Sequence, residues 1–398
     1  LSFHAIVDLC RSLIGIEDGD DEAQALGKLD ATVRGLLPDE LEDVLPFLAA
    51  LLGLPLDEAR ATRLAGLHGD AMEKLTLRSV SQLLRATSDD RPVVAVMDDL
   101  HWADQSSIEL FESLLHLCEE HPILFVNVCR LGYATTSDRI RDYARKEHAD
   151  RGFEIELKPL DASAARSMLN NLFHQDDLPR DTRQRIEEKA HGNPFYIEEV
   201  VRSLVDDGAV EYVEGRFRAT DRITSVTIPD SIHEVVMARV DALDVAKRQL
   251  LQTVSVIGAS FHIEVLAGIV EDVTRLAGDI ESLLNAEFLV RSASARDAEY
   301  DFKHPLIQEV TYESLLHTRR EILHRKVAET MERVFPADVA GYAGMLAYHY
   351  GKGGAGERAE EFLFRAGAEA ARAAAPSEAL HFFEEAVSYT HLTLPTNR

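Results

Sequence analysis

The chain has 398 residues, 46% of them hydrophobic, so its length allows about two to four domains with sizeable cores. It carries 42 Lys and Arg against 69 Asp and Glu, a formal net charge of −27 at pH 7. This balance argues against a broad nucleic-acid-binding surface, which needs clustered basic side chains. No stretch approaches the roughly 18 consecutive apolar residues of a membrane span. We therefore expect no membrane contact and a cytoplasmic location.

The cysteines and the two ends of the chain lead to further expectations. Cys10, Cys118 and Cys129 form no Cys-x-x-Cys pair, which fits a reducing compartment and predicts no structural zinc site. The sequence opens at Leu1 without a methionine, and no signal peptide is visible. Residues 388–398 (SYTHLTLPTNR) change abruptly to a β-leaning composition. We expect them to be a non-native tail and the chain to be a fragment at both ends.

The N-terminal part predicts helices and then a strand. Residues 1–90 place apolar side chains at helical spacing, and SDDRP then ends the pattern. The apolar run Val93–Met97 follows, and a run of this kind is typical of a central parallel strand buried on both faces. A helix is predicted after Trp102, where the first turn would be capped either by Ser106 with Glu109 or by Asp104.

The next elements complete an α/β pattern. Residues 122–130 (PILFVNVCR) predict a second buried strand, residues 139–150 a helix, and residues 153–160 (FEIELKPL) a third strand. Strands that alternate with helices in this way indicate a parallel sheet.

From Asp161 the pattern becomes helical. Gly192 ends one predicted helix and Pro194 begins the next, and residues 209–220 alternate around Glu214-Gly215 as a β-hairpin does. Short helices follow, together with extended pieces near residues 288–291 and 300–302. Three helices and a β-wing are the signature of a winged-helix module. After Tyr312 the chain is predicted helical to Val387, with the small and aromatic residues of a helical hairpin repeat.

Two adjacent acids follow the first predicted strand directly, Asp98 and Asp99. Ligands bind at strand tips in α/β folds, and two neighbouring carboxylates repel each other unless a cation lies nearby. Mg²⁺ fits, because it needs only one or two carboxylates when phosphates and water supply its other ligands. Asp98 would then hold the water shell of the metal, and Asp99 would orient an attacking water at the terminal phosphate. The alternative interpretation is a solvated start of a loop.

The segment VVAVMDDLHWAD, Val93–Asp104, resembles the Walker B segment of the STAND class of P-loop ATPases. These are AAA-like ATPases of bacterial signalling proteins, which occur alongside nucleotide-cyclase, kinase or LuxR-type output domains. Other segments resemble motifs of this family in the family's order, over roughly residues 1–387. They are the sensor strand that ends at Arg130, the glycine-x-proline motif at Gly192–Pro194, winged-helix segments at 228–243 and 302–332, and a tetratricopeptide-like (TPR-like) segment at 360–387.

The resemblance implies roles for individual residues. Arg130 would sense the terminal phosphate, although pairing with the two aspartates or with solvent is the alternative. Pro194, beside Gly192, would lie near the nucleotide base, whereas the residues alone indicate only a helix stop and a helix start. His101 would approach the phosphates or hold the loop in place. Trp102 is expected to pack under the loop.

The resemblance also implies a fold class, α/β plus α, with a partial P-loop NTPase parallel sheet. Its expected parts are an NTPase core without its first strand at 1–160, a helical lid at 161–222, a winged-helix module with following helices at 223–335, TPR-like helices at 336–387, and the tail at 388–398.

A glycine-rich phosphate loop of the form G-x-x-x-x-G-K-[ST] does not occur in the sequence. The segment Gly351–Gly356 (GKGGAG) lacks the Ser or Thr and is expected to link two helices. In the family the loop lies upstream, so we expect the full-length protein to bind ATP and these residues alone to bind it poorly. The family's sheet order implies that the strands at 93–97 and 123–128 pair in parallel, and that residues 153–157 either remain unpaired, one strand-width away, or collapse into the gap left by the first strand.

The function implied is a signal-transduction switch that binds ATP and Mg²⁺. An effector, either a protein or a small molecule, would bind the helical repeats, and the output domain would lie outside these residues. Two alternatives remain open: a DNA-binding transcriptional regulator without its output domain, and a non-enzymatic scaffold with a degenerate ATPase. The net charge of −27 favours the winged helix as an intramolecular lever over a DNA reader.

Overall fold

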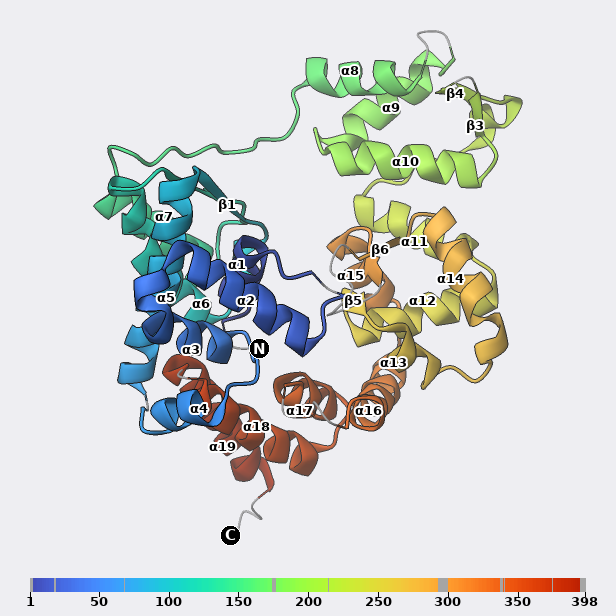
Figure 1. The fold of residues 1–398 in the computed structure, drawn as a ribbon. Helices are drawn as coiled ribbons and strands as arrows, with labels where there is room; N and C mark the ends of the chain where they lie inside the picture. The colour runs from blue at the N-terminus through green and yellow to red at the C-terminus, as the bar shows by residue number, and fades with distance from the viewer. Residues whose placement is uncertain are drawn as a thin grey trace. The chain divides into compact units, whose positions relative to one another are not determined.

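The computed structural model describes residues 3–17, 19–67, 69–173, 177–213, 215–292, 300–336, 339, 341–373 and 375–393. The chain divides into two compact units, which are considered one at a time. The first comprises Leu1–Phe153 with Ala328–Arg398, and the second Glu154–Val327. Figure 1 shows the elements of both units.

The first unit begins with helices, as the sequence predicts. They are α1 (His4–Ile14), α2 (Glu22–Leu36), α3 (Leu41–Leu51), α4 (Glu58–Ala65) and α5 (Asp70–Asp90). Aspartates cap two of them: Asp21 accepts a hydrogen bond from Gln24 N at the start of α2, and Asp57 accepts one from Arg60 N at the start of α4. The apolar faces of α1, α2, α3 and α5 join one buried cluster with the strands and α6 (Gln105–Leu115).

The strands β1 (Val93–Met97) and β2 (Ile123–Asn127) form a parallel pair. Their register runs from Val93 opposite Ile123 to Met97 opposite Asn127. The predicted parallel pairing is therefore confirmed. The connection between them is α6, and α7 (Ser137–Glu147) follows β2.

Burial of the sheet on both faces, however, is a wrong prediction. Side chains of β1 alternate, so that Ala95 is 2% exposed while Val94 is 61% and Val96 is 59% exposed. Leu124 of β2 is 57% exposed on the same pattern. One face packs against α5 and α6, and none of the described residues covers the other. An apolar run alone does not reveal that only one face has a partner.

Residues 153–160, predicted as a third strand, pair with no strand in the described part of the chain. Phe153 is 87% exposed and Leu157 is 89% exposed. The prediction of a third strand is therefore wrong, whereas the lack of pairing at residues 153–157 is one of the two outcomes that the family's sheet order implied.

The C-terminal helices return to the first unit. They are α17 (Ala343–Lys352), α18 (Gly356–Arg372) and α19 (Pro376–Thr393). Ala370 and Ala379 lie in the same buried cluster as the N-terminal helices. The segment Gly351–Gly356 links α17 to α18, as predicted. Residues 388–393 continue α19 and do not adopt the extended conformation that their composition suggested, and residues 394–398 lie outside the described range.

The second unit opens with three helices and a hairpin: α8 (Ala162–Leu172), α9 (Arg180–Ala190), α10 (Pro194–Asp206), β3 (Val210–Val213) and β4 (Arg216–Ala219). The two strands pair antiparallel, which confirms the predicted hairpin. Gly215 in its turn has φ +85°. Glu214, the other predicted turn residue, lies outside the described residues.

The remaining elements combine helices with a small antiparallel sheet of strand order β5-β7-β6. They are α11 (Ile232–Ala242), α12 (Val245–Ile257), β5 (Ser260–Phe261), α13 (Ile263–Ala267), α14 (Leu276–Asn285), β6 (Leu289–Arg291), β7 (Tyr300–Phe302), α15 (Pro305–Glu313) and α16 (His317–Val334), whose residues from Ala328 on belong to the first unit. The two predicted extended pieces pair as β6 and β7, β5 was not predicted, and residues 293–299 lie outside the described range. Among the described helices, none has the length and apolar character needed to cross a bilayer.

Candidate functional site

The carboxyl ends of β1 and β2 bring the predicted site residues to one edge of the sheet. Because Met97 lies opposite Asn127, the residues that follow both strands leave the sheet together. Hydrogen bonds continue past the strands, from Val128 N to Met97 O at 2.9 Å and from Leu100 N to Val128 O at 3.0 Å. This is the edge at which parallel α/β sheets bind ligands.

Asp98 and Asp99 form a tight turn directly after β1. Asp99 has φ 50° and ψ 35°, in the left-handed region that non-glycine residues seldom adopt and that aspartate tolerates better than most. The amide of Asp99 donates to Oδ1 of Asp98 at 2.9 Å. The Asp99 side chain is 62% exposed, so its carboxylate is open to solvent.

The charges at this edge are uncompensated within the described residues. Neither aspartate forms an ion pair with Lys or Arg, and Arg130 forms none with either of them. The alternative in which Arg130 pairs with the two acids is therefore not observed. Two open carboxylates beside one another fit the donor set of a hydrated Mg²⁺, which takes its other ligands from water and phosphate. No group of three or more His, Cys, Asp or Glu in the described residues is arranged to hold a metal.

His101 lies beneath this turn, in the short 3₁₀ helix Leu100–Trp102. Its side chain is only 1% exposed, and Nδ1 lies 3.9 Å from Oδ1 of Asp99. The same Nδ1 accepts a hydrogen bond from the backbone N–H of Arg130 at 3.4 Å. His101 therefore contacts both residues to which catalytic roles were assigned.

Trp102 does not pack under the loop, and that prediction is wrong. Its side chain is among the exposed hydrophobics, at 67%. Its ring lies 5.0 Å from that of His101 and 5.7 Å from that of Tyr133, centroid to centroid. Tyr133 also contacts His101 at 4.9 Å, so three aromatic rings cluster beside the acid pair.

Asp104 has a structural role at the start of α6. Its carboxylate accepts hydrogen bonds from Ser107 N at 2.8 Å and from the amides of Phe3 and His4 at 3.0 Å each. Asp104 therefore caps α6, and the alternative cap by Ser106 with Glu109 is not observed. One carboxylate thus ties the first turn of α6 to the start of α1.

Gly192 and Pro194 lie in the second unit, where local geometry accounts for both. Gly192 has φ +76°, and a Cβ on it would lie 2.2 Å from the carbonyl oxygen of Leu160. The Gly192 carbonyl accepts a hydrogen bond from Leu160 N at 2.8 Å. Pro194 is the first residue of α10, capped by Asn193, whose side chain accepts from Phe195 N.

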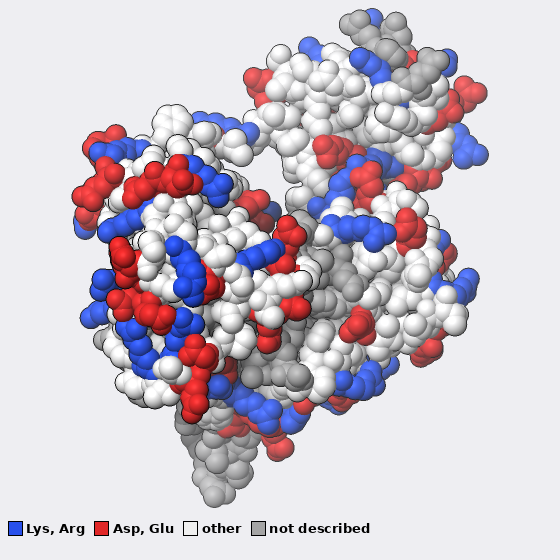
Figure 2. Space-filling view, viewed as in Figure 1, with Lys and Arg blue, Asp and Glu red and all other residues white. Residues whose placement is uncertain are grey.

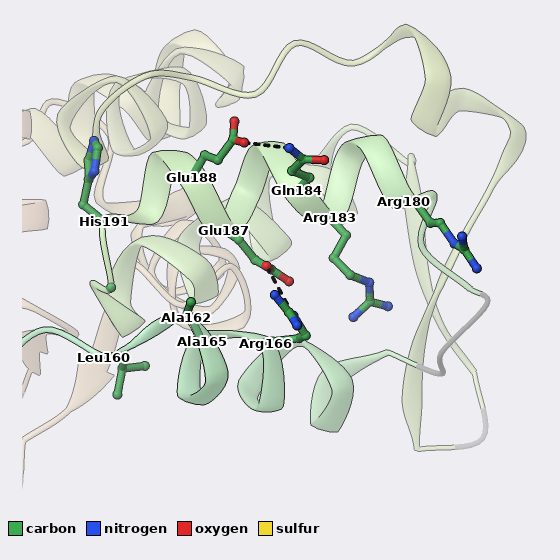
Figure 3. A pocket seen from close by; sticks show the side chains of 11 residues that line it. Leu160, Ala162, Ala165, Arg166, Arg180, Arg183, Gln184, Glu187, Glu188 and His191 are labelled. Atoms are coloured by element: carbon green, nitrogen blue, oxygen red, sulfur yellow. Dashed lines mark hydrogen bonds and ion pairs between the residues drawn. The ribbon is translucent and has the colours of Figure 1, made fainter.

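A groove of about 620 Å³ runs between α8 and α9, and Gly192 lines one part of it (Figure 3). Two pairs of its polar side chains are engaged with one another. Arg166 pairs with Glu187 at 3.6 Å, and Gln184 donates to Glu188 at 2.8 Å. These contacts use some of the groups that would otherwise recognise a ligand, and Arg183, which also lines the groove, donates to Oδ1 of Asn170 at 2.6 Å.

The structure thus brings together Asp98, Asp99, His101 and Arg130, while Gly192 and Pro194 belong to the other unit. Sequence reasoning missed Thr136, whose hydroxyl donates to the His101 carbonyl at 3.2 Å, and the ring of Tyr133. Both follow β2 in a loop without a recognisable motif. Their position just after the second parallel strand was the available signal.

Comparison with known proteins finds a family model that matches the N-terminal part of the chain and relatives that cover more of it. The model of a family described as the AAA ATPase domain matches residues 1–126, which contain α1–α6, β1 and most of β2. An uncharacterized protein of Rhizobium meliloti is 27% identical over 323 residues, covering 80% of this chain and 30% of that protein. The peroxide stress-activated histidine kinase mak3 of Schizosaccharomyces pombe is 22% identical over 252 residues, covering 61% of this chain and 10% of the kinase.

No solved structure matches the chain. The chain spans less than a third of the length of either of these curated relatives. Together with the acid pair at the tip of β1, the family match supports an AAA-like ATPase domain in the N-terminal part of this chain.

Proposed function

We propose that these residues are the nucleotide-dependent switch of a larger signalling protein of the STAND type, which hydrolyses ATP with Mg²⁺. The observation that carries the proposal is the uncompensated pair Asp98 and Asp99 at the carboxyl edge of a parallel sheet, with Arg130 leaving the neighbouring strand. A match to AAA ATPase domains over residues 1–126 supports nucleotide binding at this edge.

Each residue of the site would have a distinct role. Asp98, directly after β1, would hold the water shell of Mg²⁺, which neutralises phosphate charge when bound. Asp99 would orient a water molecule toward the terminal phosphate and accept its proton. Arg130 would sense that phosphate, because its guanidinium has no partner among the described residues to compete for it.

The phosphate loop would come from a part of the protein beyond these 398 residues. The open face of the sheet supports this, because Val94, Val96 and Leu124 are each more than half exposed there. Parallel sheets are ordinarily covered on both faces. A further strand with its helix would cover these side chains, and the loop between them would supply the backbone N–H groups that bind phosphates.

The second unit would carry the response to the nucleotide. Helices α8–α10 would act as the lid, with Gly192 and Pro194 close to the base, and α11–α16 with the sheet β5-β7-β6 would act as a winged-helix lever. A lever fits the charge better than a DNA reader does. The net charge is −27, and on the face drawn in Figure 2 basic side chains are interspersed with acidic ones.

The C-terminal helices would belong to a TPR-like effector-binding region. They pack on each other through alternating small and aromatic residues, such as Gly367 against the ring of Phe383. The relative in S. pombe is a peroxide stress-activated histidine kinase, which supports a role in signalling for the larger protein. ATP, Mg²⁺ and an effector are the partners that this arrangement calls for, and the output domain would lie outside these residues.

Equilibrium binding of a fluorescent ATP analogue tests the proposal. We expect the full-length protein to bind the analogue in a Mg²⁺-dependent manner. The 398 residues alone should bind it at least about tenfold more weakly. Asp98→Asn in the complete protein should reduce the Mg²⁺ dependence. The matched control is Asp90→Asn, an exposed aspartate in the last turn of α5. Equal, tight, Mg²⁺-dependent binding by the 398 residues would contradict the proposal.

A further inference from the structure

The backbone of Arg130 is held by side chains and not by the sheet. Strand β2 ends at Asn127, three residues earlier, and among the described residues no backbone–backbone hydrogen bond includes Arg130. Its N–H instead donates to Nδ1 of His101 at 3.4 Å. Its carbonyl accepts from the hydroxyl of Ser137 at 2.5 Å. The two sides of this residue are thus fixed from two different segments.

The imidazole of His101 is itself fixed on several sides. The ring is enclosed between the aromatic rings of Trp102 and Tyr133, with centroids at 5.0 and 4.9 Å. Its backbone carbonyl accepts a hydrogen bond from Thr136 Oγ1 at 3.2 Å. With 1% of its side chain exposed, His101 presents no surface to a bound phosphate.

We infer that His101 is a positioning residue, which holds the backbone of Arg130 in register with Asp99 and does not contact the nucleotide. Its effect on hydrolysis rests on the proposed function, whereas its effect on the Arg130 backbone does not. An arginine that must reach one phosphate needs its main chain in one place, because a displacement of about 1 Å is enough to lower a rate substantially.

The hydrogen bond also defines the form of the ring. Nδ1 must accept from the Arg130 N–H, so the ring is neutral and its proton is on Nε2. An imidazolium would have no acceptor to offer at this position. Asp99 Oδ1, at 3.9 Å from Nδ1, lies beyond hydrogen-bonding distance and stays free for its own role.

Two substitutions distinguish the effect of the hydrogen-bond acceptor of His101 from the effect of its aromatic ring. His101→Phe keeps an aromatic ring and removes the acceptor, whereas His101→Asn removes the ring and places Oδ1 as many bonds from Cα as Nδ1. In the 398-residue chain, hydrogen exchange at the Arg130 amide should accelerate about tenfold or more with His101→Phe and stay near wild type with His101→Asn. The amides of Leu100 and Val128, which bond to main-chain carbonyls, are the internal reference.

The opposite order would overturn the inference. If His101→Asn loosens the Arg130 amide and His101→Phe does not, the ring acts by packing alone. Equal exchange in wild type and both variants would also overturn it. Ser137→Ala, which removes the bond to the Arg130 carbonyl, provides a second variant that should loosen the same loop without touching the histidine.

ATP hydrolysis by the full-length protein gives the second readout. His101→Phe should lower kcat about tenfold while the Kd for ATP stays within about twofold, and His101→Asn should recover most of kcat. A large loss of ATP affinity with His101→Phe would show direct contact with the nucleotide and overturn the inference. If the wild-type protein hydrolyses no ATP, the proposed function fails, and the exchange experiment still decides the positioning role.

Discussion

Glu199 of α10 and Arg239 of α11 form an ion pair in which the two side chains are only 1% and 2% exposed. Arg239 also pairs with Asp206 at 3.0 Å and donates to the carbonyl of Ala286 at 2.6 Å. Its guanidinium lies 4.5 Å from the centroid of the Phe288 ring. Arg239 of α11 therefore joins α10 to the segment between α14 and β6, so these elements should move as one body.

Glu199→Ala should destabilise the second unit by about 3–5 kcal/mol, because it leaves the Arg239 charge buried with its main partner removed. Denaturant unfolding of the 398-residue chain measures this. Glu198→Ala, the exposed neighbour in the same helix, is the matched control and should change the free energy of unfolding by less than about 0.5 kcal/mol. Similar values for the two variants would show that the pair does not join α10 to the following helices.

Gly192→Ala should destabilise the same unit through a clash as well as through backbone strain. Gly215 offers a matched control, since it has φ +85° but no atom within 4 Å of an added Cβ, whereas Gly192 would meet Leu160 O at 2.2 Å. We expect Gly215→Ala to cost about 1 kcal/mol and Gly192→Ala at least about 2 kcal/mol more, measured by denaturant unfolding. Equal costs would mean that the approach of Leu160 is relieved without strain.

The raised pKa of Glu378 in α19 predicts that the stability of the first unit depends on pH. Burial, and then the neighbouring charge of Asp104, raise the pKa of Glu378 from 4.5 to about 7. The folded state thus holds the proton more tightly than the unfolded state, so the contribution to stability is complete below pH 4.5 and is lost as the pH rises through 7. The first unit should be more stable at pH 5 than at pH 8 with respect to this group.

Glu378→Gln should remove that part of the pH dependence, because the amide stays neutral throughout. Glu384→Gln, an exposed position on the same helix, should leave it unchanged. Thermal unfolding of each variant at pH 5 and pH 8 measures the difference. A pH profile that Glu378→Gln shares with wild type would assign the dependence to other groups.

Local sequence signals predicted much of this fold. The hairpin of β3 and β4 and the helix boundary at Gly192 and Pro194 depend on residues close in sequence, whereas the parallel pairing of β1 and β2 was expected from the family's sheet order. The site at the tip of β1 was predicted for the same reason, because two adjacent acids directly after an apolar run mark the end of a strand, where α/β folds bind their ligands.

Features that depend on distant partners could not be predicted. Glu199 and Arg239 are 40 residues apart, and each lies in a segment that reads as an ordinary charged helix face. Trp102 looked like a packing residue because tryptophan is mostly buried, yet the loop after β2 meets only one side of its ring. The apolar strand β1 gave no sign that only one of its faces is covered.

Val96 lies on the open face of the sheet, and substituting it tests whether this face is covered in the full-length protein. Val96→Ser should change the stability of the 398-residue chain by less than about 0.5 kcal/mol, because the side chain is 59% exposed. In the full-length protein, where we propose that this face is covered, the same substitution should lower the free energy of unfolding by about 1–3 kcal/mol. Val93→Ser, at a position 7% exposed, should be costly in both chains. An equally small effect of Val96→Ser in both would leave the sheet open in the longer protein as well.

The most direct measurement determines ATP turnover and ATP affinity for the Asp99→Asn variant of the full-length protein and compares them with wild type. Asp90→Asn is the control. If Asp99 orients the attacking water, the substitution should lower kcat by about 100-fold or more while the Kd for ATP stays within a few-fold of wild type. The control should match wild type in both quantities. Undiminished turnover by Asp99→Asn would contradict a catalytic role for the acid pair at the tip of β1.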